Sequence, residues 1–304
     1  MVQILELFGG IGSPRIALRN LGIETKSIDY VEIDEKAVRS YNAIFENDLD
    51  YTTQSVVDWN LRPDILIHGS PCQDISVIGK KAGADKGSGT RSSLMWETLN
   101  IIKQMGAWKP RVVIWENVKG VLYKNMRDNF NLYLEEMQSL GYSNSFQVLD
   151  ARDFGLPQKR HRVFTVSLLQ SEPFNFNLLK YKKMVDIREI IEKVTSDDYI
   201  IKSPSMLSRL PGASDSSFGG RLIPIEEWSY TITTKQNRCP NSGIVPVGNN
   251  QYRLLTEKEC WRLQGYTDED YNAAARVNGR TALYTQAGNS IPVGIFESLF
   301  EVLI

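Results

Sequence analysis

The chain has 304 residues, of which 35 are Lys or Arg, 36 are Asp or Glu and two are His, so its formal net charge is −1. With 42% hydrophobic and 23% charged residues it has the composition of a globular protein, which excludes a mainly disordered chain. No apolar run approaches the roughly 18 residues of a membrane span, and the near-zero charge argues against a nucleic-acid binder, because such proteins are commonly basic.

The length suggests one large domain, or a domain with a smaller partner. The N-terminus, residues 1–8, lacks a basic region and a cleavage site, so we expect no signal peptide. The three cysteines, Cys72, Cys239 and Cys260, are too few for a disulfide framework and indicate a reducing cytoplasm.

The first half of the chain alternates apolar strand patterns with helical patterns, which is typical of an α/β fold with a parallel sheet covered by helices. In chain order we predict the following elements: strand Val2–Phe8, helix 13–20, strand Thr25–Val31, helix Asp34–Phe45, strand Asp64–His68, helix Ser92–Met105, strand Arg111–Trp115, helix Met126–Leu140, and strands Ser145–Asp150 and Arg162–Leu168. Pro14 suits the first turn of its helix, and Asp34 is a candidate N-cap.

The pattern changes after about residue 170. Residues 174–250 are rich in Ser, Pro, Gly and Asn and have weak periodicity, which predicts a second, smaller domain without a regular βαβ rhythm. Helical periodicity returns over Leu254–Leu263 and Ile291–Leu303.

The glycine turn Phe8–Gly12 lies between a predicted strand and a predicted helix. Glycines allow a ligand to approach the backbone, and a helix N-terminus offers free N–H groups. Glu32, at the end of the next strand, and Asp58 could bind a ribose and a base. The same residues fit a tight turn with two solvated acids, and the dinucleotide fingerprint is not met.

Cys72, in the sequence Ser70-Pro71-Cys72-Gln73, follows a central strand, where open α/β sheets place their active sites. Glu116 ends the next strand at the same sheet edge and could donate a proton there. A buried inert cysteine and a structural glutamate are the alternatives.

Two arginines, Arg160 and Arg162, precede the strand Arg162–Leu168. Alternation aims both at one face, so two guanidinium groups could meet one polar ligand. A solvated strand end is the alternative.

Together these segments resemble the DNA (cytosine-5) methyltransferase family over nearly the whole chain. Phe8–Gly12 resembles its S-adenosylmethionine (SAM) loop, and Val31–Asp34 its ribose-binding strand end. Ser70–Gln73 is similar to its nucleophile motif, Glu116–Val118 to its acid motif and Gln158–Arg162 to its QxRxR motif. Leu254–Tyr266 is similar to the segment before the last motif, which Gln286–Ser290 resembles.

The resemblance implies a SAM-dependent methyltransferase sheet with helices on both faces and a smaller irregular target-recognition domain. It implies SAM as the cofactor, no metal, and these cofactor-binding residues: Phe8, Gly10, Gly12, Glu32, Ile33, Asp58, Pro71, Leu94, Asn289 and Ser290. In this scheme Phe8 packs on SAM, Glu32 binds its ribose, Ile33 covers its adenine and Asp58 accepts from the adenine amino group.

The resemblance also implies the catalytic residues. Cys72 is the nucleophile, Glu116 the partner of cytosine N3, and Arg160 and Arg162 hold the flipped base. The glycine-rich segment 76–91 closes over that base. The implied substrate contacts are Gln73, Ser76, Lys80, Arg91, Asn117 and Gln158.

Four positions depart from the family's common pattern. Glu6 stands where an Asp is usual, and Ser13 and Ser92 replace glycines. Ile78 replaces a frequent serine. None of the four changes removes a catalytic group.

The remaining cysteine, histidine and basic residues have simpler interpretations. We expect Cys260 in a helix core, His68 hydrogen-bonded at a strand end, and His161 pointing away from the two arginines. For residues 181–183, Tyr-Lys-Lys, we favour a contact with a nucleic-acid phosphate over a solvated loop.

We therefore predict a catalytic domain over residues 1–170 plus 276–304 and a target-recognition domain over 171–275, with double-stranded DNA between them. The net charge conceals two basic clusters, one over 158–183 and one at Lys80, Lys81, Lys86 and Arg91. A neutral body with a locally positive cleft can still bind DNA. We expect a cytoplasmic monomer of bacterial or phage origin. The alternatives are a tRNA cytosine-5 methyltransferase, a catalytically silent DNA-binding homologue and, less favoured, a nicotinamide-dependent oxidoreductase.

Overall fold

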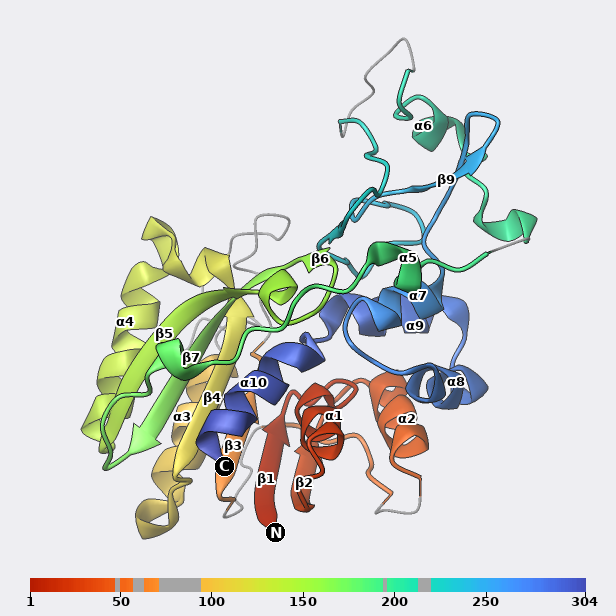
Figure 1. Cartoon of the computed structure of the whole chain (residues 1–304). Coiled ribbons are helices and arrows are strands. Elements are labelled where there is room, and N and C mark those ends of the chain that lie inside the picture. Colours follow the sequence, from red (N-terminus) through yellow and green to blue (C-terminus); the bar gives the residue numbers. More distant parts are fainter. Residues whose placement is uncertain (47–49, 57–62, 71–93, 194–195, 213–219) are drawn as a thin grey trace.

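A mixed sheet forms the centre of the computed structural model of the chain (Figure 1). The structure describes residues 1–304 except 47–49, 57–62, 71–93, 194–195 and 213–219. Within these residues the sheet has six strands in the order β2-β1-β3-β4-β7-β5. Their bounds are β1 Val2–Leu7, β2 Thr25–Val31, β3 Ile65–His68, β4 Val112–Val118, β5 Tyr142–Asp150 and β7 His161–Leu169.

The direction of β7 corrects the predicted parallel sheet. Strands β2, β1, β3 and β4 run parallel as predicted, but β7 runs antiparallel to both β4 and β5. A parallel return takes about a dozen or more residues, commonly with a helix. Residues 151–160, which join β5 to β7, hold only the 3-10 helix η4 (Ala151–Asp153) and the short strand β6 (Gln158–Lys159), so the chain reverses direction.

Helices cover both faces of the sheet, as predicted. Because side chains alternate along a strand, Ile4 and Leu5 of β1 enter two different hydrophobic cores. The core around Ile4 is closed by α1 (Ser13–Asn20) and α10 (Val293–Leu303), which pack against each other. The core around Leu5 is closed by α3 (Met95–Gln104) and α4 (Lys124–Ser139). The parallel strands β3 and β4 are buried almost throughout, as expected for strands covered on both sides.

Local signals at the helix starts behave as predicted. Pro14 stands in the first turn of α1, and Asp34 caps α2 (Glu35–Ile44) by accepting a hydrogen bond from the Lys36 backbone nitrogen at 2.9 Å.

Three helices precede α10 in the C-terminal part of the chain. Helix α7 (Glu257–Arg262) lies within the predicted helix Leu254–Leu263. Helices α8 (Asp268–Val277) and α9 (Arg280–Asn289) were not predicted. Helix α8 packs on α2, and its Asp270 pairs with Arg19 of α1 at 2.8 Å. Helices α7 and α8 both begin with a capping box, in which Thr256 pairs with Glu259 and Thr267 with Asp270.

The described residues between β7 and α7 form only short elements, as the composition of this stretch predicted. They are η5 (Phe176–Leu178), α5 (Ile187–Ile190), η6 (Asp197–Tyr199), α6 (Pro204–Leu207), β8 (Ser229–Tyr230), β9 (Val245–Gly248) and β10 (Gln251–Arg253). Figure 1 shows the part with α6 and β9 standing apart from the sheet. Two further 3-10 helices, η2 (Gly106–Trp108) and η3 (Lys119–Leu122), flank β4.

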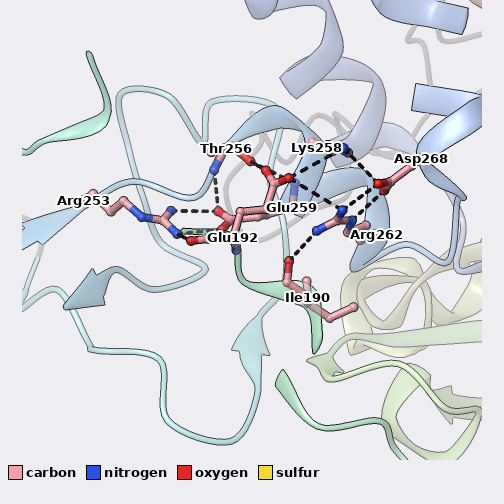
Figure 2. A network of polar contacts seen from close by, with 8 residues as sticks. All are labelled: Ile190, Glu192, Arg253, Thr256, Lys258, Glu259, Arg262 and Asp268. Carbon is pink, nitrogen blue, oxygen red and sulfur yellow. Dashed lines mark hydrogen bonds and ion pairs between the residues drawn. The ribbon is translucent and has the colours of Figure 1, made fainter. Parts of the chain in front are cut away.

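A buried ion pair fixes this irregular stretch to α7 (Figure 2). Arg253 meets Glu259 through two nitrogen–oxygen contacts of 2.7 and 2.8 Å, and both side chains are buried. Arg253 also donates to the carbonyl oxygen of Glu192 at 2.9 Å. Since a buried charge is tolerated only with such pairing, this network holds three segments in one arrangement.

The domain boundaries at 170 and 276 stay predictions.

None of the described helices is long and apolar enough to cross a membrane.

Candidate active site

Left-handed backbone angles distinguish the glycine turn after β1. Phe8, Gly10 and Gly12 all adopt positive φ angles, of 57°, 56° and 78°. The Gly10 nitrogen donates to Glu32 Oε2 at 2.9 Å, and its carbonyl accepts from the Tyr30 hydroxyl at 2.5 Å. The turn is therefore held from β2 on both its donor and its acceptor side.

Gly12 packs closely on the side chains below the turn, and its predicted contact with SAM stays a prediction. A Cβ at this position would lie 2.7 Å from the ring of Tyr41 and 2.8 Å from the ring of Phe45. Tyr41 stacks on Tyr30 with ring centroids 3.7 Å apart. The turn thus rests on an aromatic layer that leaves no room for a side chain.

Glu32 and Ile33 are placed at the end of β2. The second carboxylate oxygen of Glu32 accepts from the backbone nitrogens of Ile33 at 2.8 Å and Asp34 at 3.0 Å. The Ile33 side chain is 75% exposed, and it is available to cover a planar ligand.

Glu6 is a buried carboxyl beneath the turn. Its Oε2 accepts from the Tyr41 hydroxyl at 2.6 Å, while its Oε1 is buried without a hydrogen-bond partner. Burial raises the pKa of Glu6 to about 7, against smaller opposing effects of Tyr41 and Arg15. Glu6 lines the pocket described next.

One pocket brings together residues from distant parts of the sequence. It lies at the carboxyl ends of β1, β3 and β4, where open α/β sheets bind ligands. Its lining includes the predicted residues Phe8, Gly10, Glu116, Asn289 and Ser290, together with Glu6, Gly9, Ser13, Ile67, Gly69 and Ile291.

Glu116 lines this pocket from β4, and Glu6 is a second acid in the lining. The Oε1 atom of Glu116 lies 3.0 Å from Arg162 Nε, and both side chains are largely buried. Burial raises the pKa of Glu116, and the positive charges of Arg162 and Arg160 oppose that shift without cancelling it. The carboxyl therefore keeps a proton to higher pH than an exposed glutamate does.

Asn117 and Trp115 hold the end of β3. The Trp115 indole donates to Ser70 Oγ at 3.1 Å, and the Asn117 amide donates to the same oxygen at 3.3 Å. The Ser70 that they fix stands two residues before Cys72 in the sequence.

Gln158 and Arg160 clamp the backbone of Ile232. The Gln158 amide accepts from the Ile232 nitrogen and donates to the Leu263 carbonyl, both at 2.9 Å. The Arg160 guanidinium donates to the carbonyls of Ile232 at 2.9 Å, Gly288 at 3.1 Å and Ser290 at 2.7 Å. Gln158 is buried with both ends of its amide in internal hydrogen bonds, and its predicted contact with DNA stays a prediction.

A model of the C-5 cytosine-specific DNA methylase family matches residues 2–304. The chain belongs to this family. The predicted family and its DNA (cytosine-5) methyltransferase activity are therefore confirmed.

Similar proteins cover the chain from end to end. The type II methyltransferase M2.ScrFI of Lactococcus lactis subsp. cremoris is 32% identical, over 100% of this chain and 99% of that protein. The type II methyltransferase M.Bsp6I of Bacillus sp. (strain RFL6) is 31% identical, over 99% and 98%. The crystal structure of S. pombe Dnmt2 methyltransferase matches with a TM-score of 0.78 at 18% identity, over 100% of this chain and 98% of that one, which confirms the predicted fold.

Part of the predicted site of this methyltransferase lies outside the described residues. These positions are Asp58, Pro71, Cys72, Gln73, Ser76, Ile78, Lys80, Lys81, Lys86, Arg91 and Ser92. Leu94 is described: it caps α3 and packs, partly buried, against the core around Leu5. Its predicted contact with SAM stays a prediction.

The other residues singled out in the sequence make contacts within the protein. His68 lies within hydrogen-bond distance of Tyr133, and burial lowers its pKa to about 3. Cys260 is fully buried in α7, as predicted. His161 pairs with Asp150 at 3.2 Å, and the Lys182 ammonium pairs with Glu297 at 2.6 Å. The described residues hold no group of three or more His, Cys, Asp or Glu side chains that could bind a metal.

Three residues of the site escaped the sequence interpretation. Ser70 was noted only as part of the Cys72 motif, Ile232 carried no signal, and Tyr266 appeared only at the end of the segment before the last motif. Ile232 acts through its backbone, which leaves no mark on residue type. For Tyr266, the one hint in the sequence was the unusual serine at position 13, because the two hydroxyl groups lie within hydrogen-bond distance.

Proposed function

We propose that this enzyme transfers a methyl group from SAM to carbon 5 of a specific cytosine in double-stranded DNA. The reaction proceeds on a flipped base through a covalent bond between Cys72 and carbon 6. Residues 171–275 form the target-recognition domain, and the enzyme works in the cytoplasm of a bacterium or of a phage-infected cell.

The proposal rests chiefly on one observation. Glu116, the glycine turn and Asn289–Ser290 come from three distant segments, yet all line one pocket. The pocket therefore has a proton donor beside a backbone loop and a helix end suited to a polar ligand.

The lining fits SAM, which carries a sulfonium and an ammonium group and supplies an electrophilic methyl. The buried, unpartnered Oε1 of Glu6 suits a cationic ligand, because a bound cation would relieve its desolvation. Phe8, Ile67 and Ile291 give the same pocket apolar surface. Glu32, at the end of β2, would hold the ribose of this cofactor.

Carbon 5 of cytosine is too weak a nucleophile to accept the methyl group unaided. Addition of the Cys72 thiolate to carbon 6, with a proton or hydrogen bond from Glu116 at N3, makes carbon 5 electron-rich enough to attack the methyl. The transfer leaves S-adenosylhomocysteine. A base then removes the proton of carbon 5, the bond between carbon 6 and the Cys72 sulfur breaks, and any proton held at N3 returns to Glu116, which restores the aromatic ring. Base flipping gives access to these atoms and costs a few kcal/mol.

The surroundings of Glu116 suit its role at N3. Its raised pKa favours the protonated carboxyl relative to an exposed glutamate, and Arg162, 3.0 Å away, fixes the orientation of the carboxyl. Cys72 follows Ser70 by two residues, and Ser70 is bonded to both neighbours of Glu116 on β4. The nucleophile and the acid are thus attached to adjacent strands.

Labelled SAM supplied with plasmid DNA or with tRNA tests the reaction. We expect label in DNA, on carbon 5 of cytosine, and bisulfite sequencing of the plasmid identifies the target sequence. Label found only in tRNA would show that tRNA, and not DNA, is the substrate. Label in neither polymer would favour a catalytically silent homologue.

DNA that carries 5-fluorocytosine at the identified target tests the covalent step. Fluorine blocks the elimination, so we expect a denaturant-resistant adduct with the wild type and none with Cys72→Ala. SAM binding by Cys72→Ala, measured by calorimetry, is expected to remain. Methyl transfer by Cys72→Ala would refute the covalent mechanism.

A further inference from the structure

Three hydroxyl groups form a closed ring behind the glycine turn. Ser13 Oγ lies 2.6 Å from the Tyr266 hydroxyl and 3.0 Å from Ser290 Oγ, and the last two oxygens are 2.6 Å apart. Ser13 begins α1, Tyr266 follows α7, and Ser290 ends α9. The ring therefore ties together segments separated by more than 250 residues of sequence.

The ring is buried, and Ser290 Oγ also lies 3.3 Å from the carbonyl oxygen of Ile291. Ser13, Tyr266 and Ser290 are 4%, 3% and 5% exposed. Each hydroxyl can donate once and accept twice, so a ring of three can give every proton an acceptor. Such bonds strengthen one another where the local dielectric is low.

The position of the ring connects both sides of the pocket. Ser13 and Ser290 line it, one directly after Gly12 and the other directly after Asn289. Ser290 also uses its carbonyl oxygen to hold Arg160, which lies close enough to Glu116 to oppose its pKa shift. A change in the ring therefore alters the distance between the glycine turn and the segment that carries Asn289.

We propose that Ser13 and Tyr266 are positioning residues for SAM, whose hydroxyls hold the glycine turn and Ser290 at the spacing that the cofactor requires. This inference rests on the proposed function. The ring preorganises the pocket, so SAM does not have to order it on binding. The serine that replaces a usual glycine at position 13 is thus a functional feature of this chain, paired with the hydroxyl of Tyr266.

Tyr266→Phe and Ser13→Ala each remove one ring hydroxyl with little change in shape. We expect each to raise the Kd and the KM for SAM about tenfold, which corresponds to about 1.4 kcal/mol. The loss falls on KM rather than on kcat, because saturating SAM restores the spacing. The double variant should bind SAM no more weakly than either single variant, since one lost hydroxyl already opens the ring.

Tyr142→Phe is the matched control. Its hydroxyl is also buried and donates to the Pro110 carbonyl at 2.7 Å, at the start of β5 and away from the pocket. We expect this variant to unfold at lower temperature with an unchanged Kd for SAM.

Calorimetric titration with SAM, thermal unfolding and steady-state kinetics separate the outcomes. If Tyr266→Phe and Ser13→Ala lose thermal stability as Tyr142→Phe does but bind SAM as tightly as the wild type, the ring has no role in positioning. A wild-type chain that does not bind SAM would overturn the proposed function as well, so the two failures are distinguishable.

Discussion

The Arg160 guanidinium donates to the carbonyl oxygen of Ser290 at 2.7 Å, and it does so from the interior of the protein. The same group holds the carbonyls of Gly288 and Ile232. A fixed planar fork of donors suits several carbonyls at once, whereas an ammonium cannot reproduce it. Arg160 therefore joins the segment around Ile232 to the segment that carries Gly288 and Ser290.

We expect Arg160→Lys to destabilise the protein by about 3 kcal/mol, because buried carbonyls lose charge-assisted hydrogen bonds. Urea unfolding measures this loss. The neighbouring Lys159 is exposed, and Lys159→Ala should stay within about 0.5 kcal/mol of the wild type. If Arg160→Lys and the wild type have the same free energy of unfolding, the hydrogen bonds of Arg160 to the three carbonyls do not stabilise the protein.

Glu116→Gln should slow methyl transfer while SAM still binds. The amide keeps the shape of the side chain but cannot give a proton to N3, so we expect a fall of about a hundredfold to ten-thousandfold. Single-turnover methylation of prebound DNA measures the step. The exposed Glu172 offers the same substitution as a control, and Glu172→Gln should keep the wild-type rate. A Glu116→Gln rate above a tenth of the wild-type rate would exclude this role.

Glu6 makes the stability of the protein without SAM depend on pH. Its pKa of about 7 in the folded state lies above the value of 4.5 for an ordinary glutamate, so the folded state holds the proton more tightly. The stability that this group contributes is therefore complete below pH 4.5 and is lost as the pH rises through 7. The loss is about 3 kcal/mol.

Urea unfolding at pH 5 and pH 8 tests the effect of Glu6. Glu6→Gln can still accept from Tyr41 but does not titrate, so its stability should fall less between the two pH values than that of the wild type. Glu172→Gln again serves as the control. An identical pH response of Glu6→Gln and the wild type would show that Glu6 is ionised in the folded protein at both values.

Gly288 has no space for a side chain. A Cβ there would overlap the backbone nitrogen of Thr234 and the carbonyl carbon of Thr233, and neither atom can rotate away. We expect Gly288→Ala to cost about 1–3 kcal/mol of stability. A shift of the segment that carries Thr233 and Thr234 by about 1 Å should also slow methyl transfer about a hundredfold.

Unfolding and methylation assays of Gly288→Ala are best compared with Thr281→Ala, at an exposed position of the same helix α9. The control should retain both properties. If Gly288→Ala methylates DNA at the wild-type rate, the close approach of α9 to Thr233 and Thr234 is not required for function.

Much of the fold was predictable from local sequence because its determinants are local. The glycine turn from Phe8 to Gly12, the cap at Asp34 and the apolar strand before Glu116 each depend on residues a few positions apart. Short-range sterics and side-chain periodicity act within such windows. The order of motifs along the chain was enough to indicate the family.

Tertiary structure alone decided how these parts meet. The ring of Ser13, Tyr266 and Ser290 joins positions up to 277 residues apart, and no local pattern encodes that distance. Arg160 finds its partners among carbonyl oxygens, which every residue carries, so its role as a clamp leaves no signature in residue type. The sequence by itself determined which chemical groups are present and at which strand ends they stand. Long-range packing determined which of them share a pocket, because contacts between distant segments form only when the whole chain closes around its two cores.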